Sequence, residues 1–440
     1  MRTSRHPRRL LVGAVVGSSL VLGSVAVPAS STLMAEAAPT PPAQAPASLD
    51  WSPVPVQAPK GGIDTSDLLS TGNMTCRSRS DCVVAGYVES YATVSTGPAE
   101  VYHGVIWHWD GKIWSVQGTG VSGSVGLVDT ACPSITDCWA VGASFVGKLL
   151  EQPVGLIDHY NGTTWSPSTM PDPNGVAFNG ISCTSPSNCV AVGNRELSTS
   201  STVPLAYRWD GKSWSSLPIP KPTGALWTVL DAVDCFSPTS CTALGDADNS
   251  SKGPGYFFGE ALSGASWSLF NMPNTQKFDM GNLTGLYGLS CPQDNSCLAV
   301  GSALGYTAGQ SGADFPGGVA DTWDGTSWAS VKSPSPPEGG SYILYTDSCL
   351  ASTDCWVALG FPSILGPLNH NIPLAHWNGS SFTVSTAPTM GFMAAIGCLD
   401  INVGTWCIGL GEAPGKKLSS ATMAGGDFLV AKGTGVGKLN

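Results

Sequence analysis

The sequence predicts an all-β fold, a seven-bladed β-propeller of four-stranded blades with one disulfide per blade. Three observations lead to this prediction. Fourteen cysteines form seven local pairs, an aromatic turn follows six of them, and Gly, Pro, Ser and Thr are abundant where helix formers are few. Self-similarity at a period of roughly 50 residues is typical of propellers and other repeat folds.

Each repeat unit begins with two cysteines, separated by five residues in six units and by eight in the last. The pairs are Cys76/Cys82, Cys132/Cys138, Cys183/Cys189, Cys235/Cys241, Cys291/Cys297, Cys349/Cys355 and Cys398/Cys407. Two thiols per unit cannot complete a four-ligand zinc site, and this spacing is not one that zinc ligands use. We therefore expect a disulfide in every pair, and no metal site.

A second signature follows each of the first six pairs. It reads HWDGKIW (108–114), HYNGTTW (159–165), RWDGKSW (208–214), LSGASW (262–267), TWDGTSW (322–328) and HWNGSSF (376–382). Asp-Gly and Asn-Gly favour tight hairpin turns between strands. The signature therefore predicts the turn between the third and fourth strands of each unit.

The third unit illustrates the four strands. Residues 180–183 (GISC) and 189–193 (CVAVG) read as a hairpin, 204–209 (PLAYRW) as the third strand and 213–220 (SWSSLPIP) as the fourth. Prolines gather in the fourth strand. Because proline cannot donate a backbone hydrogen bond, this strand fits the outer edge of a blade.

The two ends of the repeat region complement each other. The seventh unit has a third strand at 427–432 (DFLVAK) but no aromatic fourth strand, whereas 50–55 (DWSPVP) matches the fourth-strand pattern. We expect this N-terminal strand to complete the last blade and to close the ring.

The remaining segments lie outside the repeats. Residues 1–37 combine a basic start, an apolar stretch and a small-x-small site, which is typical of a signal peptide. An uncleaved membrane anchor is the alternative interpretation. Residues 38–48 read as a Pro/Ala-rich linker, 49–432 as the propeller and 433–440 as a C-terminal tail. We expect a secreted, extracellular protein with no membrane insertion after cleavage.

Composition excludes other classes of protein. A net charge of −11 provides no basic surface for nucleic acid, and 42% apolar residues argue against disorder. No motif for a nucleotide or a redox group is present, so we expect no cofactor and no nucleic-acid partner, and we predict a monomer.

The repeat, written C-x5-C-W-A-V-G and then H-W-D-G-x-x-W-S, resembles a broad group of secreted actinobacterial propeller proteins. Its turn is similar to the Asp-box of sialidase-like propellers, although Asp110 and Gly111 are adjacent where an Asp-box has one residue between them. The length of the repeat is close to that of kelch and galactose-oxidase-like blades. The resemblance covers residues 49–432. It implies the fold and transfers no catalytic residue.

Successive strands alternate in direction. The turns between the paired cysteines and the Asp-Gly turns therefore share one rim of the propeller. The loops between the second and third strands, which differ in length, lie on the other rim together with the connections between units. Binding residues usually lie on variable loops held by a rigid scaffold. The candidates for ligand binding are Trp227, Arg195, Tyr256, Glu89, Glu196, Asp314 and His370. Ordinary loop packing is the alternative for each. We expect the recurring His108, His159 and His376 to be part of the scaffold.

Two hypotheses for function follow. The first is a non-catalytic extracellular binding or scaffold protein that recognises a carbohydrate or protein ligand with these loops, since no catalytic signature is found. The alternative is a carbohydrate-active enzyme, a glycoside hydrolase or lyase, that uses carboxylates of the loop rim. A sialidase is disfavoured, because sialidases hold their substrate with several arginines and only Arg77, Arg79, Arg195 and Arg208 follow residue 37.

Overall fold

The computed structural model describes residues 50–54, 68–94, 97–121, 123–145, 152–198, 201–249, 255–273, 278–279, 285–305, 316–334, 342–360, 373–386, 392–400, 404–412 and 428–434. All of them belong to one compact unit that spans Gln44–Asn440. No helix in this described part is long and apolar enough to cross a membrane.

The described strands form seven antiparallel sheets, numbered here along the chain. Sheet 1 contains β2 (Leu68–Thr71), β3 (Thr75–Ser78), β4 (Asp81–Val94), β5 (Gly97–Trp109) and β6 (Trp114–Gln117). Sheet 2 contains β7 (Ser124–Ser134), β8 (Asp137–Phe145), β9 (Val154–Tyr160) and β10 (Trp165–Pro167). Sheet 3 contains β11 (Val176–Ser185), β12 (Asn188–Ser198), β13 (Ser201–Trp209) and β14 (Trp214–Leu217). Sheet 4 contains β15 (Trp227–Ser237), β16 (Ser240–Asp248), β17 (Tyr256–Ser263) and β18 (Ser266–Asn271).

Sheet 5 contains β19 (Phe278–Asp279), β20 (Gly285–Gln293), β21 (Ser296–Gly305), β22 (Pro316–Trp323) and β23 (Trp328–Ser330). Sheet 6 contains β24 (Ile343–Ala351), β25 (Asp354–Gly360), β26 (Pro373–Trp377) and β27 (Phe382–Thr386). Sheet 7 contains β28 (Phe392–Asp400), β29 (Thr405–Glu412), β30 (Phe428–Thr434) and β1 (Asp50–Val54).

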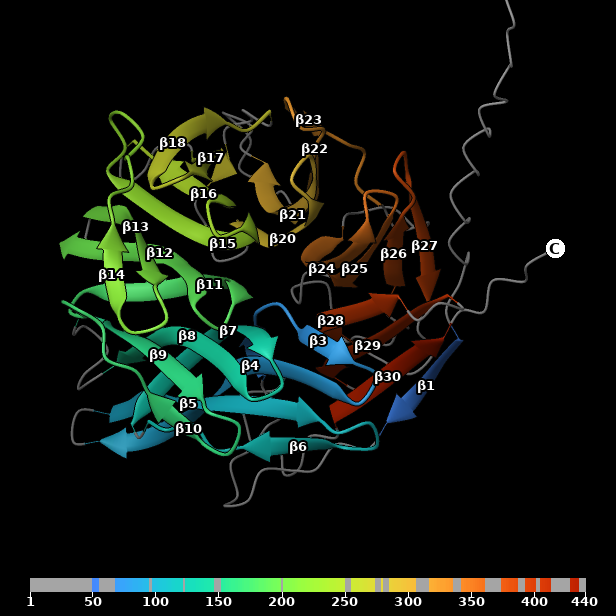
Figure 1. Ribbon diagram of the computed structural model, residues 1–440, viewed down its shortest axis with the longest axis horizontal. Helices are drawn as coiled ribbons and strands as arrows, with labels where there is room; N and C mark the ends of the chain where they lie inside the picture. Colours follow the sequence, from blue (N-terminus) through green and yellow to red (C-terminus); the bar gives the residue numbers. More distant parts are fainter. Residues whose placement is uncertain are drawn as a thin grey trace, which may run out of the picture. The chain divides into compact units, whose positions relative to one another are not determined.

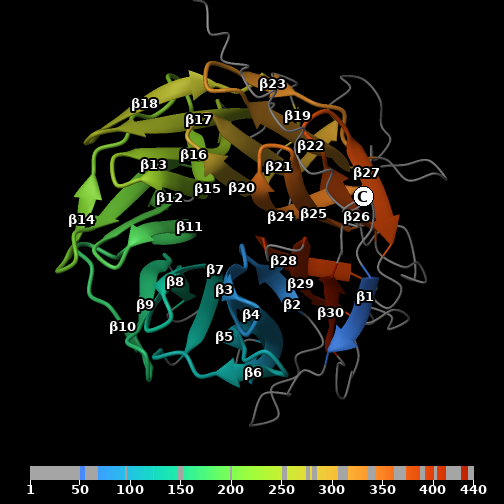
Figure 2. The ribbon, with the colours of Figure 1, turned by 45° about the vertical axis from the view of Figure 1, so that its right-hand side comes forward.

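The sheets follow one another around a ring, which identifies the fold as a β-propeller with four-stranded blades. The inner strands β3, β7, β11, β15, β20, β24 and β28 each contact the next, and β28 contacts β3 in turn. Figures 1 and 2 show these strands around a common centre, with strands such as β6, β14, β18 and β27 at the periphery.

Sheet 7 joins the two ends of the repeat region. Strand β1 pairs antiparallel with β30, and the register aligns Asp50 with Thr434 and Val54 with Val430. The predicted pairing of the N-terminal strand with the last sheet is therefore confirmed. Strand β30 ends at Thr434, two residues beyond the boundary at 432 that the sequence predicted for the propeller.

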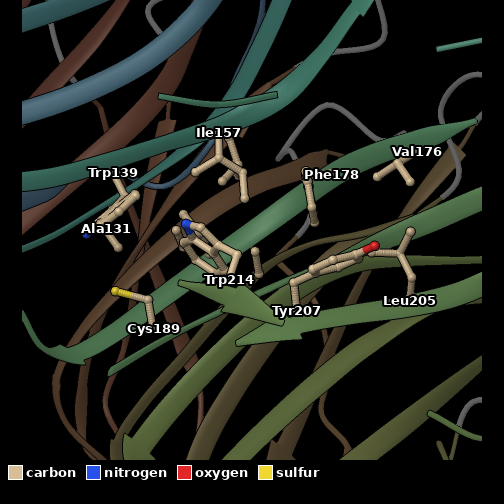
Figure 3. Close-up of a cluster of buried hydrophobic side chains, with 12 residues drawn as sticks. Ala131, Trp139, Ile157, Val176, Phe178, Cys189, Leu205, Tyr207 and Trp214 are labelled. Carbon is tan, nitrogen blue, oxygen red and sulfur yellow. The ribbon is translucent and has the colours of Figure 1, made fainter. Parts of the chain in front are cut away.

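Apolar side chains fill the spaces between neighbouring sheets. A buried cluster lies between each pair of adjacent sheets, including sheets 7 and 1. Figure 3 shows the cluster between sheets 2 and 3, where Trp139 and Ile157 face Phe178, Tyr207 and Trp214. Burial of apolar area stabilises such a fold by about 25 cal/mol per Å². The repeated tryptophans are thus explained as packing between blades.

The predicted disulfides are all present, one in each sheet, and no cysteine of the described residues is free. The bonds are Cys76–Cys82, Cys132–Cys138, Cys183–Cys189, Cys235–Cys241, Cys291–Cys297, Cys349–Cys355 and Cys398–Cys407. Each bond joins the inner strand of its sheet to the second strand.

The cysteines lie in the strands that flank the turn, as the sequence predicts for units such as the third. The second cysteine of every pair is buried, at most 5% exposed: Cys82, Cys138, Cys189, Cys241, Cys297, Cys355 and Cys407. The physical reason is that this residue belongs to the second strand and packs into the apolar cluster between neighbouring sheets. The disulfides therefore contribute to the core as well as closing the hairpins.

The Asp-Gly turns contact the cysteine turns of the same sheet, as expected for two features that share one rim. A Cβ on Gly111 would lie 2.7 Å from Cβ of Ser80. Gly111 has φ +92°, a conformation that glycine adopts without strain. Asp110 accepts hydrogen bonds from the backbone N–H groups of Ile113 and Lys112, which lower the pKa of its carboxyl.

The recurring histidines are part of the scaffold, which confirms their expected role. Each bonds through Nε2 to the aspartate that precedes the second cysteine of its own sheet. The pairs are His108–Asp81 (2.9 Å), His159–Asp137 (3.0 Å) and His376–Asp354 (2.9 Å).

Candidate functional site

The inner strands share a β-bulge four residues before the first cysteine. In sheet 4, Leu230 pairs with Gly245, and the next residue of β15 with a partner is Ala232. Asp231 lies between them without a partner in the ladder. A bulge re-aims the side chain of the extra residue and is common beside functional sites. The glycine opposite permits this close approach, because a Cβ on Gly245 would lie 1.9 Å from the carbonyl oxygen of Val229.

The bulge recurs around the ring and presents a different side chain in each sheet. From sheet 2 to sheet 7, the bulged residues include Val128, Asn179, Asp231, Tyr287, Tyr345 and Ala394. Four consecutive sheets therefore carry a polar residue here. We call Asn179, Asp231, Tyr287 and Tyr345 the inner arc. All four are half-buried, and they lie on the strands nearest the centre of the ring.

The first members of the inner arc are held by the neighbouring sheet. The Nδ2 atom of Asn179 donates a hydrogen bond to the carbonyl oxygen of Leu230 at 3.0 Å. The backbone N–H of Leu286 donates to Oδ2 of Asp231 at 3.4 Å. These contacts fix the orientation of both side chains and also join sheets 3, 4 and 5.

The two tyrosines form the aromatic part of the arc. The rings of Tyr287 and Tyr345 are stacked, with centroids 6.4 Å apart and an interplanar angle of 20°. Burial raises the pKa of the Tyr287 hydroxyl, which also hydrogen-bonds with Ser302. The hydroxyl therefore stays protonated at physiological pH. Two half-buried aromatic rings beside polar groups can contact a sugar ring.

A pair of carboxyl groups lies beside these tyrosines. Asp231 hydrogen-bonds with Asp246 of β16, which is 5% exposed. Burial, together with the charge of Asp246, raises the pKa of Asp231 well above its usual range. Burial also raises the pKa of Asp246 to about 7. At neutral pH the pair therefore retains a proton, which is the state that a general acid requires.

Other polar side chains hold the inner strands together. In four sheets, the residue before the first cysteine accepts a hydrogen bond from the backbone N–H of the first cysteine of the next sheet. The bonds are Cys235 to Ser182 (3.0 Å), Cys291 to Asp234 (2.7 Å), Cys349 to Ser290 (3.1 Å) and Cys398 to Ser348 (3.0 Å). We assign these residues to the scaffold.

The disulfides belong to the scaffold and not to the candidate site. The second cysteines Cys82, Cys138, Cys189, Cys241 and Cys407 are buried between sheets and bonded to their partners. Their role is to tie the two inner strands of each sheet together.

One further hydrogen bond closes the centre of the ring. The Thr346 hydroxyl of sheet 6 donates to Oδ1 of Asn73 in sheet 1 at 2.7 Å, across the inner strand of sheet 7. The backbone N–H of Asn73 donates to Asp129, which also accepts from the backbone N–H of Ile181. The side chains of Thr346, Asn73 and Asp129 thus link sheets 1, 2, 3 and 6 close to the bulges.

The structure places four of the predicted ligand-binding residues. Trp227 is the first residue of β15 and is half-buried, aligned with Asp248 in the ladder. Tyr256 is half-buried on the same sheet, and burial together with the charge of Asp248 raises the pKa of its hydroxyl. Both residues lie on sheet 4, which also carries the carboxyl pair.

The predicted candidates on sheet 3 belong to a different network. The guanidinium of Arg195 pairs with Asp172 at 2.9 Å, and it also donates to the carbonyl oxygens of Asp172 and Asn174 and to the Tyr207 hydroxyl. The backbone N–H of Glu196 donates to the carbonyl oxygen of Gly175, and burial raises the pKa of its carboxyl. Arg195 thus binds loops of its own chain. Its contacts give no support to a role in holding a substrate carboxylate.

The other candidates cannot be placed. Glu89 lies in β4, aligned with Tyr102 in the ladder, but its side chain is outside the described part of the chain. Asp314 and His370 also lie outside the described residues. Among the residues described, no group of three or more His, Cys, Asp or Glu side chains suits a metal ion.

The inner arc was not found by sequence reasoning. The bulge displaces one residue per inner strand, so simple alternation of inward and outward residues fails there. A usable signal does exist in the sequence. Counting back four residues from the first cysteine of units 3 to 6 yields Asn179, Asp231, Tyr287 and Tyr345.

The chain was compared with known proteins. No known family and no curated protein matches it. Solved structures resemble it at low identity. An α-L-arabinanase of Penicillium chrysogenum shows 10% identity and a TM-score of 0.41, covering 67% of this chain and 89% of that one. An ulvan lyase shows 9% identity and a TM-score of 0.44, covering 83% and 92%. A Trypanosoma rangeli sialidase shows 9% identity and a TM-score of 0.41, covering 87% and 59%. At these identities and scores, the comparisons assign no activity to this chain.

Proposed function

We propose that this protein is a carbohydrate-active enzyme that binds a neutral glycan at the inner arc. The observation that carries the proposal is the combination of a proton-retaining carboxyl pair, Asp231–Asp246, with the stacked rings of Tyr287 and Tyr345. Aromatic faces pack against sugar rings, while carboxyl and amide groups bond to hydroxyls.

The carboxyl pair would act as one proton donor. Because the two groups hydrogen-bond to each other, they are closer than the about 5–9.5 Å that separates the two catalytic carboxyls of glycosidases. The proton of the pair would pass to the glycosidic oxygen as the C–O bond breaks. In hydrolysis, water would then supply the hydroxyl group that the anomeric carbon gains, and the second proton of the water would return to the carboxyl pair.

Charge favours a neutral glycan over an anionic one. The inner arc contains a carboxyl pair and no basic residue, and the chain has a net charge of −11. An anionic sugar would be repelled unless a cation compensated its charge. This argument favours a glycoside hydrolase over a lyase that acts on uronic acids.

The proposal extends to the architecture and to the location of the protein. We propose that the seven sheets act as seven blades of one closed ring, since an apolar cluster lies between each adjacent pair.

We also propose that the protein is secreted. Seven disulfides are consistent with an oxidising compartment.

The test is incubation of the purified protein with a panel of neutral polysaccharides, with detection of new reducing ends. We expect Asp231→Asn and Asp246→Asn to lose turnover by about 100-fold or more, the usual contribution of a general acid. Tyr345→Ala should weaken binding. Glu196→Gln, outside the arc, is the control and should behave like the unaltered protein.

A second outcome would favour the other hypothesis. If the panel detects binding that Tyr345→Ala abolishes, but no product is released, the protein is a non-catalytic binding module. An unsaturated product would identify a lyase. If neither binding nor turnover depends on the inner arc, the carboxyl pair serves only to join sheets 4 and 5.

A further inference from the structure

One rim of the ring carries the cysteine turns and the Asp-Gly turns, and we call it the turn rim. It has a cavity of about 280 Å³ between sheets 5 and 6. It lies on the rim opposite the loops of unequal length, where sequence reasoning expected only scaffold. Its walls come from the cysteine turns of both sheets and from the Asp-Gly turn of sheet 5. They include Gln293, Asn295, Ser296, Thr322, Trp323 and Trp377.

Two repeat positions that line the cavity have small side chains in sheet 5. One position precedes the second cysteine, and the other lies on the third strand beside it. In sheets 1, 2 and 6 an Asp–His pair occupies these positions. In sheet 5 they are Ser296 and Thr322. A hydroxymethyl group and a hydroxyethyl group fill much less space than a carboxylate bonded to an imidazole.

Other gaps between sheets on this rim are bridged by side chains. Between sheets 1 and 2, Arg77 donates to the carbonyl oxygen of Ser134. Between sheets 3 and 4, Arg208 donates to the carbonyl oxygen of Pro238. Between sheets 4 and 5, the Ser240 hydroxyl donates to Oδ1 of Asp294 at 2.7 Å. Hydroxyl and amide groups lie at the edge of the gap between sheets 5 and 6, whose inner strands are joined by the hydrogen bond from the backbone N–H of Cys349 to the Ser290 hydroxyl.

The lining determines which ligand would fit. Two amides, hydroxyls and two indole rings surround the space, and the residues lining it include no Lys, Arg or His. The carboxylate of Asp324 stays charged, because hydrogen bonds from Thr326 and Ser327 lower its pKa to about 2. An anionic ligand is therefore disfavoured. The volume is just below the range of about 300–1,000 Å³ typical of drug-sized ligands, so one sugar ring fits and a longer oligosaccharide does not.

We propose that this cavity, which we call the turn-rim pocket, binds a single neutral sugar residue, independently of the inner arc. Trp323 would provide the apolar contact, since its indole is half-buried at the wall. Gln293 and Asn295 would bond to sugar hydroxyls from the exposed edge. A site on this rim would allow the protein to hold a glycan while the inner arc engages another part of it or another chain.

The test transplants the closing pair of other sheets into sheet 5. The Ser296→Asp/Thr322→His double variant should fill the turn-rim pocket without disturbing the strands. Sheet 1 already holds Asp81 and His108 at these two repeat positions. There His108 is aligned with the aliphatic Val83, as Thr322 is aligned with Leu298 in sheet 5. Binding of neutral monosaccharides is measured by saturation-transfer NMR and titration calorimetry. We expect the double variant to weaken binding at least tenfold.

Two further variants keep the test decisive. Gln293→Ala changes an exposed side chain, so it should fold normally and reduce affinity several-fold even if the double variant does not fold. Glu196→Gln, which lies outside both the inner arc and the turn-rim pocket, should leave this binding unchanged. Unaltered sugar binding in a folded double variant and in Gln293→Ala would overturn the proposal. So would the absence of binding for every neutral monosaccharide at millimolar concentration.

Discussion

Replacing Asp347 with asparagine should stabilise the protein by an amount that grows with pH. Asp347 lies on the inner strand β24 and is 4% exposed. At the same repeat position, other sheets carry apolar residues such as Ile181, Val233 and Leu289, which are buried between sheets. Oδ1 of Asp347 has no hydrogen-bond partner. Burial, reinforced by the charge of Asp234, raises the pKa of Asp347 well above its usual range.

The sign and the size of the effect follow from the direction of this shift. A carboxyl whose pKa is higher in the folded than in the unfolded state binds its proton more tightly in the folded protein. Its contribution to stability is complete below about pH 4 and is lost as pH rises toward the folded pKa. Each pH unit in that window removes about 1.4 kcal/mol from the free energy of unfolding. Asparagine has a similar shape and does not titrate, so the variant should escape this loss.

The assay is urea denaturation of both proteins at pH 4, 5, 6 and 7. The two free energies of unfolding should be similar at pH 4, and the variant should gain about 1.4 kcal/mol over the unaltered protein with each pH unit until the folded pKa is reached. Asp324→Asn is the control, because the pKa of Asp324 is lowered and removal of its charge should bring no such gain. A difference between Asp347→Asn and the unaltered protein that is constant with pH would refute the reasoning. So would a variant that is less stable at pH 6, since both results would mean that Asp347 is ionised and paired.

Three more predictions concern the scaffold. Deletion of residues 50–54 removes the partner strand of β30 and should lower the melting temperature of the whole fold in calorimetry; an unchanged transition would contradict closure by this strand. Gly245→Ala places a methyl group against the carbonyl oxygen of Val229 and should cost about 1–3 kcal/mol in urea denaturation, whereas tolerance would show that the bulge can relax. The Cys235→Ala/Cys241→Ala variant loses a disulfide that closes a very short loop and should lose about 2 kcal/mol by the same assay; a loss near 5 kcal/mol would mean that the bond does more than constrain the unfolded chain.

The fold was predictable because its determinants repeat. The spacing of the cysteines and the aromatic turns identified the strands, and the W-S-x-x-P pattern at residues 51–55 identified the strand that joins the last sheet. The recurrence of His108, His159 and His376 at one repeat position marked them as scaffold, and each bonds to an aspartate of its own sheet.

The candidate site was less predictable for the opposite reason. Asp231 and Tyr287 occupy a position at which the units differ, and only the bulge reveals that this position matters. The partnership of Asp231 with Asp246 depends on how the bulge is aligned with the neighbouring strand, which no local pattern encodes. The turn-rim pocket was equally hidden, because the residues that line it, such as Ser296 and Thr322, belong to an otherwise regular unit.

The locality of the disulfides has a consequence for biogenesis. Each cysteine bonds to the cysteine nearest to it along the chain, six or nine positions away. Eight cysteines already allow 105 pairings and fourteen allow far more, so random oxidation would seldom produce the native set. With the proposed secretion of an unfolded chain, each bond can form as soon as its hairpin leaves the export channel, before the next pair emerges. Maturation should therefore require an oxidant but little disulfide shuffling, and an isomerase should be dispensable for its yield.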